Sequence, residues 1–126
     1  MKLATVAQWT VRICGLVLIV LGALIWTGHG DQLVDVHETF GILLVIGLWT
    51  LAFLGARAGL PVGLVVVAFV WGLIAPALGL TQANILNNGW HWVIQVIHLL
   101  IGLGAIGIAE QLGRRIRKAT PATTAA

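Results

Sequence analysis

Two histidines, each followed four residues later by a glycine, are the residues in this sequence best suited to chemistry. Gly41 follows His37, and Gly102 follows His98. On a helix each glycine lies one turn from its histidine on the same face, so space is left beneath the imidazole. Neutral imidazole is a common metal ligand, and the free space suits a planar group such as a porphyrin. The spacing predicts two histidines that hold one haem b from opposite faces.

The second of these histidines belongs to an unusual apolar segment, HWVIQVIHLLIGLGAIG. At about 100° per residue, one stripe of a helix carries all of its polar side chains and two small residues. The stripe consists of His91, Gln95, His98, Gly102 and Ala105. A polar and small-residue stripe predicts that something is held against this helix. We expect Gln95 to lie in the cofactor site, with a hydrogen bond to a neighbouring helix as the alternative.

Depth in the membrane decides which histidine pairs with His37. At 1.5 Å per residue, His98 lies about 24 Å and His91 about 35 Å from the basic boundary at Arg114. His37 lies about 30 Å from Arg57, between these two values. We favour His37 with His98 as the axial ligands, because both carry the glycine and an intramembrane histidine is expensive without a purpose. His91 is the alternate ligand.

The composition places the chain in a membrane. Of its 126 residues, 60% are hydrophobic and 9% are charged, whereas soluble domains carry roughly 25% charged residues. The net charge of +3 therefore reports membrane topology rather than nucleic-acid binding. The chain contains no nucleophile triad, phosphate-binding loop or CxxC motif. This favours an electron-transfer protein over a substrate-specific enzyme.

Four apolar segments are long enough to cross about 30 Å of hydrocarbon. They cover residues 9–27, 35–56, 60–80 and 90–112. The first is predicted to stay in the protein, because no small-x-small cleavage site of a signal peptide follows it. The predicted fold is all-α: an integral membrane four-helix bundle with up-down-up-down order. One domain is expected over residues 1–118, followed by a disordered cytoplasmic tail over 119–126.

The charges sort onto two sides of this bundle. Three acidic residues lie on one side, namely Asp31, Asp35 and Glu38. All seven basic residues lie on the side of the termini: Lys2, Arg12, Arg57, Arg114, Arg115, Arg117 and Lys118. By the positive-inside rule, both termini are cytoplasmic in a multi-pass protein of the inner (plasma) membrane.

Several other side chains in the spans are expected to have structural roles. Glu110 can pair with Arg114 one turn further along the helix. Trp49 and Trp71 lie deep in their spans and need packing partners. Pro76 is expected to kink or terminate the third helix.

Residues 36–49, VHETFGILLVIGLW, resemble the histidine-bearing helix of small bacterial b-type cytochromes. This four-helix membrane family includes superoxide oxidase and hydrogenase cytochrome subunits, and HLLIGLGAIG is a looser match. The resemblance implies haem b ligated by His37 and His98, with quinone as a redox partner. The chain departs from the family in being shorter and in lacking an arginine after the second-span histidine. Its histidines suffice for one haem.

The expected function is transfer of single electrons by a haem b between spans two and four, in the outer half of the bilayer. Quinone or an outer-side protein would exchange the electrons. The outer side has no lysine or arginine for the haem propionates. Other polar groups are expected to replace them: His29, the unused one of His91 and His98, Trp90, Trp92, Asn84, Asn87 or Asn88.

Two other functional classes stay open at this point. A small transporter or channel subunit, acting as a homo-oligomer, would use the stripe from His91 to His98 as a polar path. A structural accessory subunit of a larger membrane complex would use it only for helix packing. A path requires further polar residues along the stripe, whereas Gly102 and Ala105 follow.

Overall fold

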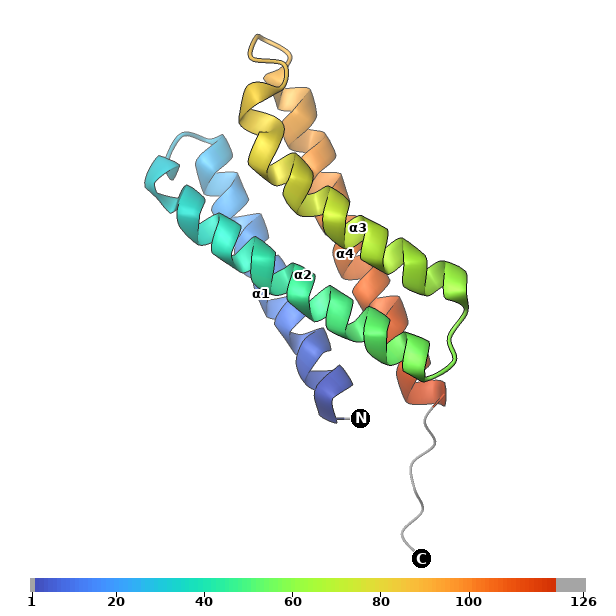
Figure 1. Ribbon diagram of the computed structural model, residues 1–126. Coiled ribbons are helices and arrows are strands. Elements are labelled where there is room, and N and C mark those ends of the chain that lie inside the picture. The colour runs from blue at the N-terminus through green and yellow to red at the C-terminus, as the bar shows by residue number, and fades with distance from the viewer. Residues whose placement is uncertain (1, 120–126) are drawn as a thin grey trace, which may run out of the picture.

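The computed structural model describes residues 2–119 and consists of four long helices, with neighbours running in opposite directions (Figure 1). The helices are α1 (Lys2–Trp26), α2 (Val34–Arg57), α3 (Val62–Thr81) and α4 (His91–Ala119). Short 3₁₀ helices precede α2 and follow α3, namely η1 (Asp31–Leu33) and η2 (Gln82–Asn84). All four long helices are long and apolar enough to cross a membrane. The prediction of an all-α fold with four membrane-length helices is confirmed.

The first and last helices, α1 and α4, extend beyond the apolar segments predicted from the sequence. α1 begins at Lys2, because Ala4, Ala7 and Val11 already belong to its buried face. α4 continues to Ala119, so the first residue of the expected tail is helical, and residues 120–126 lie outside the described part of the chain. Pro76 does not terminate α3, which continues to Thr81.

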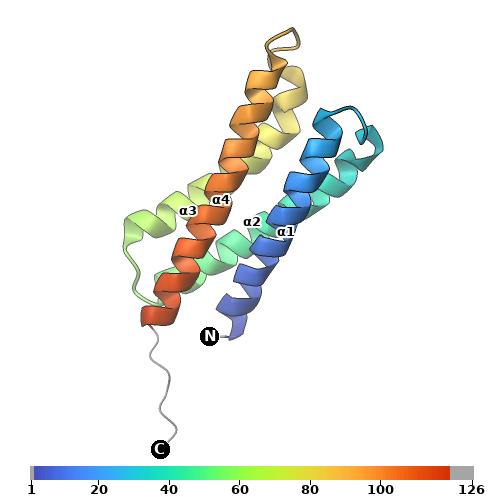
Figure 2. The same ribbon diagram turned by 180° about the vertical axis from the view of Figure 1, so that it is seen from behind.

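The bundle is tight at one end and spread at the other. Helices α1 and α2 form one hairpin, and α3 and α4 form the second (Figures 1 and 2). The hairpins meet where α1 begins and α4 ends, which we call the terminal end, and separate toward the opposite, open end. The largest fully buried side chains are Val11, Leu48, Leu51 and Leu112. α2 packs against all three other long helices, including α4 across the bundle.

The two deep tryptophans join neighbouring helices. The indole N–H of Trp71 on α3 donates a hydrogen bond to the backbone carbonyl of Ile101 on α4, at 2.8 Å. Its ring lies against Gly104, where an added Cβ would come within 2.7 Å of the ring. In the same way, the Trp49 N–H on α2 donates to the carbonyl of Phe69 on α3, at 3.2 Å. These contacts supply the packing partners expected for both residues.

A polar cluster connects α1 with α4 near the terminal end. Glu110 accepts hydrogen bonds from Nε and Nη2 of Arg12, at 2.6 and 2.9 Å, and from Nε2 of Gln8, at 2.7 Å. Gln8 is buried, and its Oε1 accepts a hydrogen bond from Arg117. Arg12 from the other hairpin makes the hydrogen-bonded ion pair with Glu110, whereas Arg114, the partner expected from the sequence, interacts with the carboxylate only through its charge.

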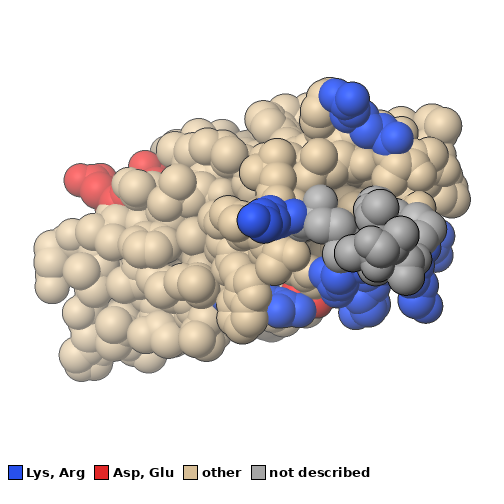
Figure 3. Space-filling view, turned by 90° about the horizontal axis from the view of Figure 1, so that it is seen from below, with Lys and Arg blue, Asp and Glu red and all other residues tan. Residues whose placement is uncertain are grey.

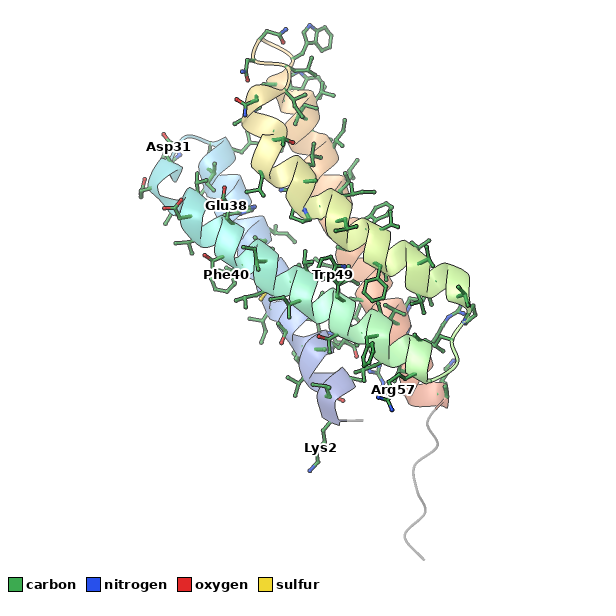
Figure 4. All side chains as sticks on the ribbon, viewed as in Figure 1. Lys2, Asp31, Glu38, Phe40, Trp49 and Arg57 are labelled. Carbon is green, nitrogen blue, oxygen red and sulfur yellow. The ribbon has the colours of Figure 1, made fainter. Side chains whose placement is uncertain are left out.

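Charged side chains are segregated along the bundle. In Figure 4, Lys2 and Arg57 lie at the terminal end, whereas Asp31 and Glu38 lie toward the open end. The space-filling view shows lysines and arginines gathered at one end of the molecule (Figure 3). Apart from Glu110, which binds Arg12 near the terminal end, the acidic and basic side chains lie toward opposite ends of the bundle, as the sequence indicated.

We expect Gly104→Ala to destabilise the fold by about 1–3 kcal/mol, the usual cost of overpacking a well-packed contact. Its methyl group would displace the Trp71 ring and break the indole hydrogen bond. Gly107→Ala, on the same helix with no atom near the new methyl, is the matched control and should cause no loss. Thermal unfolding in detergent, followed by circular dichroism, measures both. Equal effects of the two substitutions would contradict this packing.

Candidate cofactor site

A cavity of about 440 Å³ lies between the two hairpins in the half of the bundle toward the open end. All four helices line it, and most of the lining is apolar. The polar side chains on its wall are those of His37, Glu38, Gln82, Gln95 and His98. An apolar cavity of this size with a few convergent polar groups is typical of a small-molecule or cofactor site.

The structure brings His37 and His98 together on opposite sides of this cavity. His37 lies in the first turns of α2, and His98 lies two turns into α4. Their ring centroids are 6.2 Å apart, with the ring planes inclined by 50°. These are the two histidines that the sequence paired through their shared glycine spacing.

Neither imidazole has a hydrogen-bond partner among the described residues, and the Nδ1 atom of each is buried. An unpaired buried polar group costs about 1–3 kcal/mol. Buried polar groups are therefore nearly always satisfied in proteins, and an exception marks a place where a water, an ion or a ligand belongs. Each of these two imidazoles therefore has a buried nitrogen that a water, an ion or a ligand can satisfy.

The predicted space beneath each histidine is present. Gly41 and Gly102 both line the cavity, and a Cβ added to either would have no atom within 4 Å. Each glycine lies one turn from its histidine on the same helix face. The two glycines therefore leave room for a flat group beside the imidazoles, room that any side chain would fill.

Two further glycines, which sequence reasoning missed, lie against the nitrogen-bearing edges of the histidine rings. A Cβ at Gly22 on α1 would lie 3.4 Å from Cε1 of His37, and one at Gly79 on α3 would lie 3.1 Å from Cε1 of His98. Each hairpin thus supplies a glycine on its first helix and a histidine on its second. Only their position in the sequence could have identified these two glycines. Each lies near the end of the helix that precedes a histidine-bearing helix.

The alternate ligand His91 lies elsewhere. It is not among the described residues that line the cavity, and its Nδ1 bonds to the carbonyl oxygen of Ile85 at 3.1 Å. Gln95 does line the cavity, and its amide makes no hydrogen bond to another helix within the described residues. Gln82, which sequence reasoning did not select, also lines it, with a buried and unpaired Oε1.

Within residues 2–119, no group of three or more histidine, cysteine, aspartate or glutamate side chains is arranged to hold a metal ion. The two imidazoles are therefore the pair of metal-ligating side chains that the described part of the site brings close together. A structural zinc ion needs four ligands, whereas a haem iron with two axial histidines receives its other ligands from the porphyrin. Of these two metal chemistries, only the second matches the donor set.

Comparison of the chain with protein-family models, with curated proteins and with solved structures finds no match. The resemblance of residues 36–49 to b-type cytochromes consequently stays a prediction. Functional assignment rests on the cavity, on the two imidazoles and on the glycines around them.

In the cofactor-free protein, we expect His98→Leu to raise the free energy of unfolding by about 1–3 kcal/mol, because an unpaired buried polar group is replaced by an apolar one. His91→Leu is the matched control on the same helix. It removes the bond to the Ile85 carbonyl and should lower stability by about 1 kcal/mol. Thermal unfolding of both variants in detergent tests this difference. Destabilisation by His98→Leu would show that the ring has a structural partner.

Proposed function

We propose that this chain is an integral membrane protein that holds one haem b between His37 and His98 and transfers single electrons. The distance between the imidazoles is the observation that carries the proposal. With metal–nitrogen bonds of about 2.0–2.1 Å, two imidazoles that share one metal have ring centroids about 6 Å apart. The observed separation is 6.2 Å, so the rings already have the spacing that shared ligation requires.

The surroundings of the rings support a macrocycle rather than a bare ion. Gly41 and Gly102 leave open space beside the imidazoles, and the cavity walls are mostly apolar. When bound, the haem iron supplies one-electron chemistry at a potential set by its axial ligands and its burial. The mostly apolar walls disfavour water around such a group, and Gly22 and Gly79 leave room for the edges of the histidine rings.

The charge distribution supports an orientation in the membrane. Basic residues gather at the terminal end and three of the four acidic residues lie in the other half. We therefore place the terminal end in the cytoplasm of a cell with this protein in its plasma membrane. The cavity then lies in the outer half of the bilayer, where quinone or an outer-side redox protein can exchange electrons with the cofactor.

This orientation is testable with single cysteines, because the native Cys14 is buried. We expect a membrane-impermeant maleimide to label Asp31→Cys in intact cells, and Lys118→Cys only after the membrane is permeabilised. Labelling of Lys118→Cys alone in intact cells would reverse the proposed orientation. It would also place the haem in the inner half of the bilayer.

A polar conduction path is less well supported. The polar part of the α4 stripe ends at His98, and Gly102 and Ala105 continue it toward the terminal end. Ala105 is 1% exposed and belongs to the packed core. The cavity is thus closed by apolar packing on the terminal side, as suits a resident cofactor.

An absorption spectrum of the purified protein tests haem binding. We expect a Soret band that sharpens and shifts on reduction with dithionite, together with separate α and β bands. His37→Ala and His98→Ala should each abolish this spectrum, and His91→Ala should retain it. A colourless protein after expression with ample haem would overturn the proposal. If His91→Ala abolishes the spectrum and His98→Ala does not, the ligand pair is wrong.

Glycine variants separate loss of the ligand site from loss of the fold. Gly41→Leu and Gly102→Leu should fill the cavity, keep both histidines and lose most of the haem, while the helical content is unchanged. Gly107→Leu, with open space around it and outside the cavity lining, is the control and should bind haem normally. Full haem content in both cavity variants would exclude this cavity as the site.

A further inference from the structure

The polar groups of the cavity are distributed unequally between the hairpins. The first hairpin contributes an acidic side chain, Glu38, next to His37. The second hairpin contributes two neutral amides, Gln82 and Gln95. No lysine or arginine is among the described residues that line the cavity. A cofactor with one charged edge would therefore meet different chemistry at the two sides.

The two glutamines flank His98 on the side of the open end. Gln95 lies nearly one turn before His98 on α4. Gln82 lies the same distance beyond Gly79, the glycine against which the His98 ring packs. The Oε1 atom of Gln82 is buried and has no hydrogen-bond partner among the described residues. An amide group can rotate by 180°, which exchanges its acceptor oxygen for an NH₂ donor at the same place.

Three of the polar groups that the sequence offered for the haem carboxylates are engaged elsewhere. His29 lies 3.2 Å from the hydroxyl of Thr27, and His91 bonds to a backbone carbonyl. The side-chain oxygen of Asn88 accepts a hydrogen bond from the backbone N–H of Trp90. Gln82 and Gln95, in contrast, line the cavity with amides that make no hydrogen bond to the described residues.

We infer that the amides of Gln82 and Gln95 bind the carboxylate edge of the haem and so fix its orientation, with that edge toward the open end between α3 and α4. This inference rests on the proposed function. An ionised carboxylate accepts hydrogen bonds, and each amide offers two N–H donors. The Glu38 carboxylate on α2 repels the same edge, because like charges close together disfavour each other. Attraction from the second hairpin and repulsion from the first select one orientation.

Titration of the cofactor-free protein with haemin and with haemin dimethyl ester tests the inference, because the ester has the same ring and iron without ionised carboxylates. We expect Gln82→Leu and Gln95→Leu each to weaken haemin binding about tenfold, as for loss of a charge-assisted hydrogen bond. Binding of the ester should be unchanged. Gln32→Leu, at an exposed position of η1 outside the cavity lining, is the matched control.

Glu38→Gln provides a second measurement that does not depend on the glutamine variants folding. It removes the repulsion and should strengthen binding of haemin several-fold without affecting the ester. Equal effects of the variants on haemin and ester, or no effect on either, would overturn the inference while haem binding stands. Wild-type protein that binds neither compound would overturn the proposed function as well, so the two failures are distinguishable.

Discussion

The carboxylate of Glu110 joins the two hairpins at one end of the bundle, and the shape of the remainder depends on that attachment. It accepts hydrogen bonds from Arg12 and Gln8 on α1 while it is carried by α4. Between membrane helices the hydrophobic effect supplies no driving force, so association depends on close packing and on such polar contacts. Here both occur in the terminal half, where Leu48, Leu51 and Leu112 are fully buried. The other half is left free to separate and form a cavity.

We expect the cavity to lower the stability of the bundle. The buried Nδ1 atoms of His37 and His98 have no hydrogen-bond partner among the described residues, and each such group costs about 1–3 kcal/mol. Glycines on both sides of each ring add to this cost, since a glycine contributes no packing and weakens a helix. Such departures from a well-packed core are expected at functional sites. Here four glycines and two histidines that depart from it lie around one cavity.

The sequence predicted the helices and the pairing of the histidines for a common reason. Apolar length and charge placement are local properties, and the spacing of His37 with Gly41 and of His98 with Gly102 defines a helix face without knowledge of its neighbours. The partners of Glu110 and the roles of Gly22, Gly79 and Gln82 depend on which helices touch, at what height and at what angle. Arg114 was a reasonable local partner for Glu110, but Arg12 from α1 lies within reach only after the hairpins have packed.

The division of the site between the hairpins constrains how the protein is made. One hairpin carries Gly22 and His37, and the other carries Gly79 and His98. A ligand that needs both imidazoles has no complete site while only the first two helices have left the ribosome. Such a ligand can be captured only after α4 has been synthesised. The last segment to be synthesised, rather than the first hairpin, sets the moment at which the binding site matures.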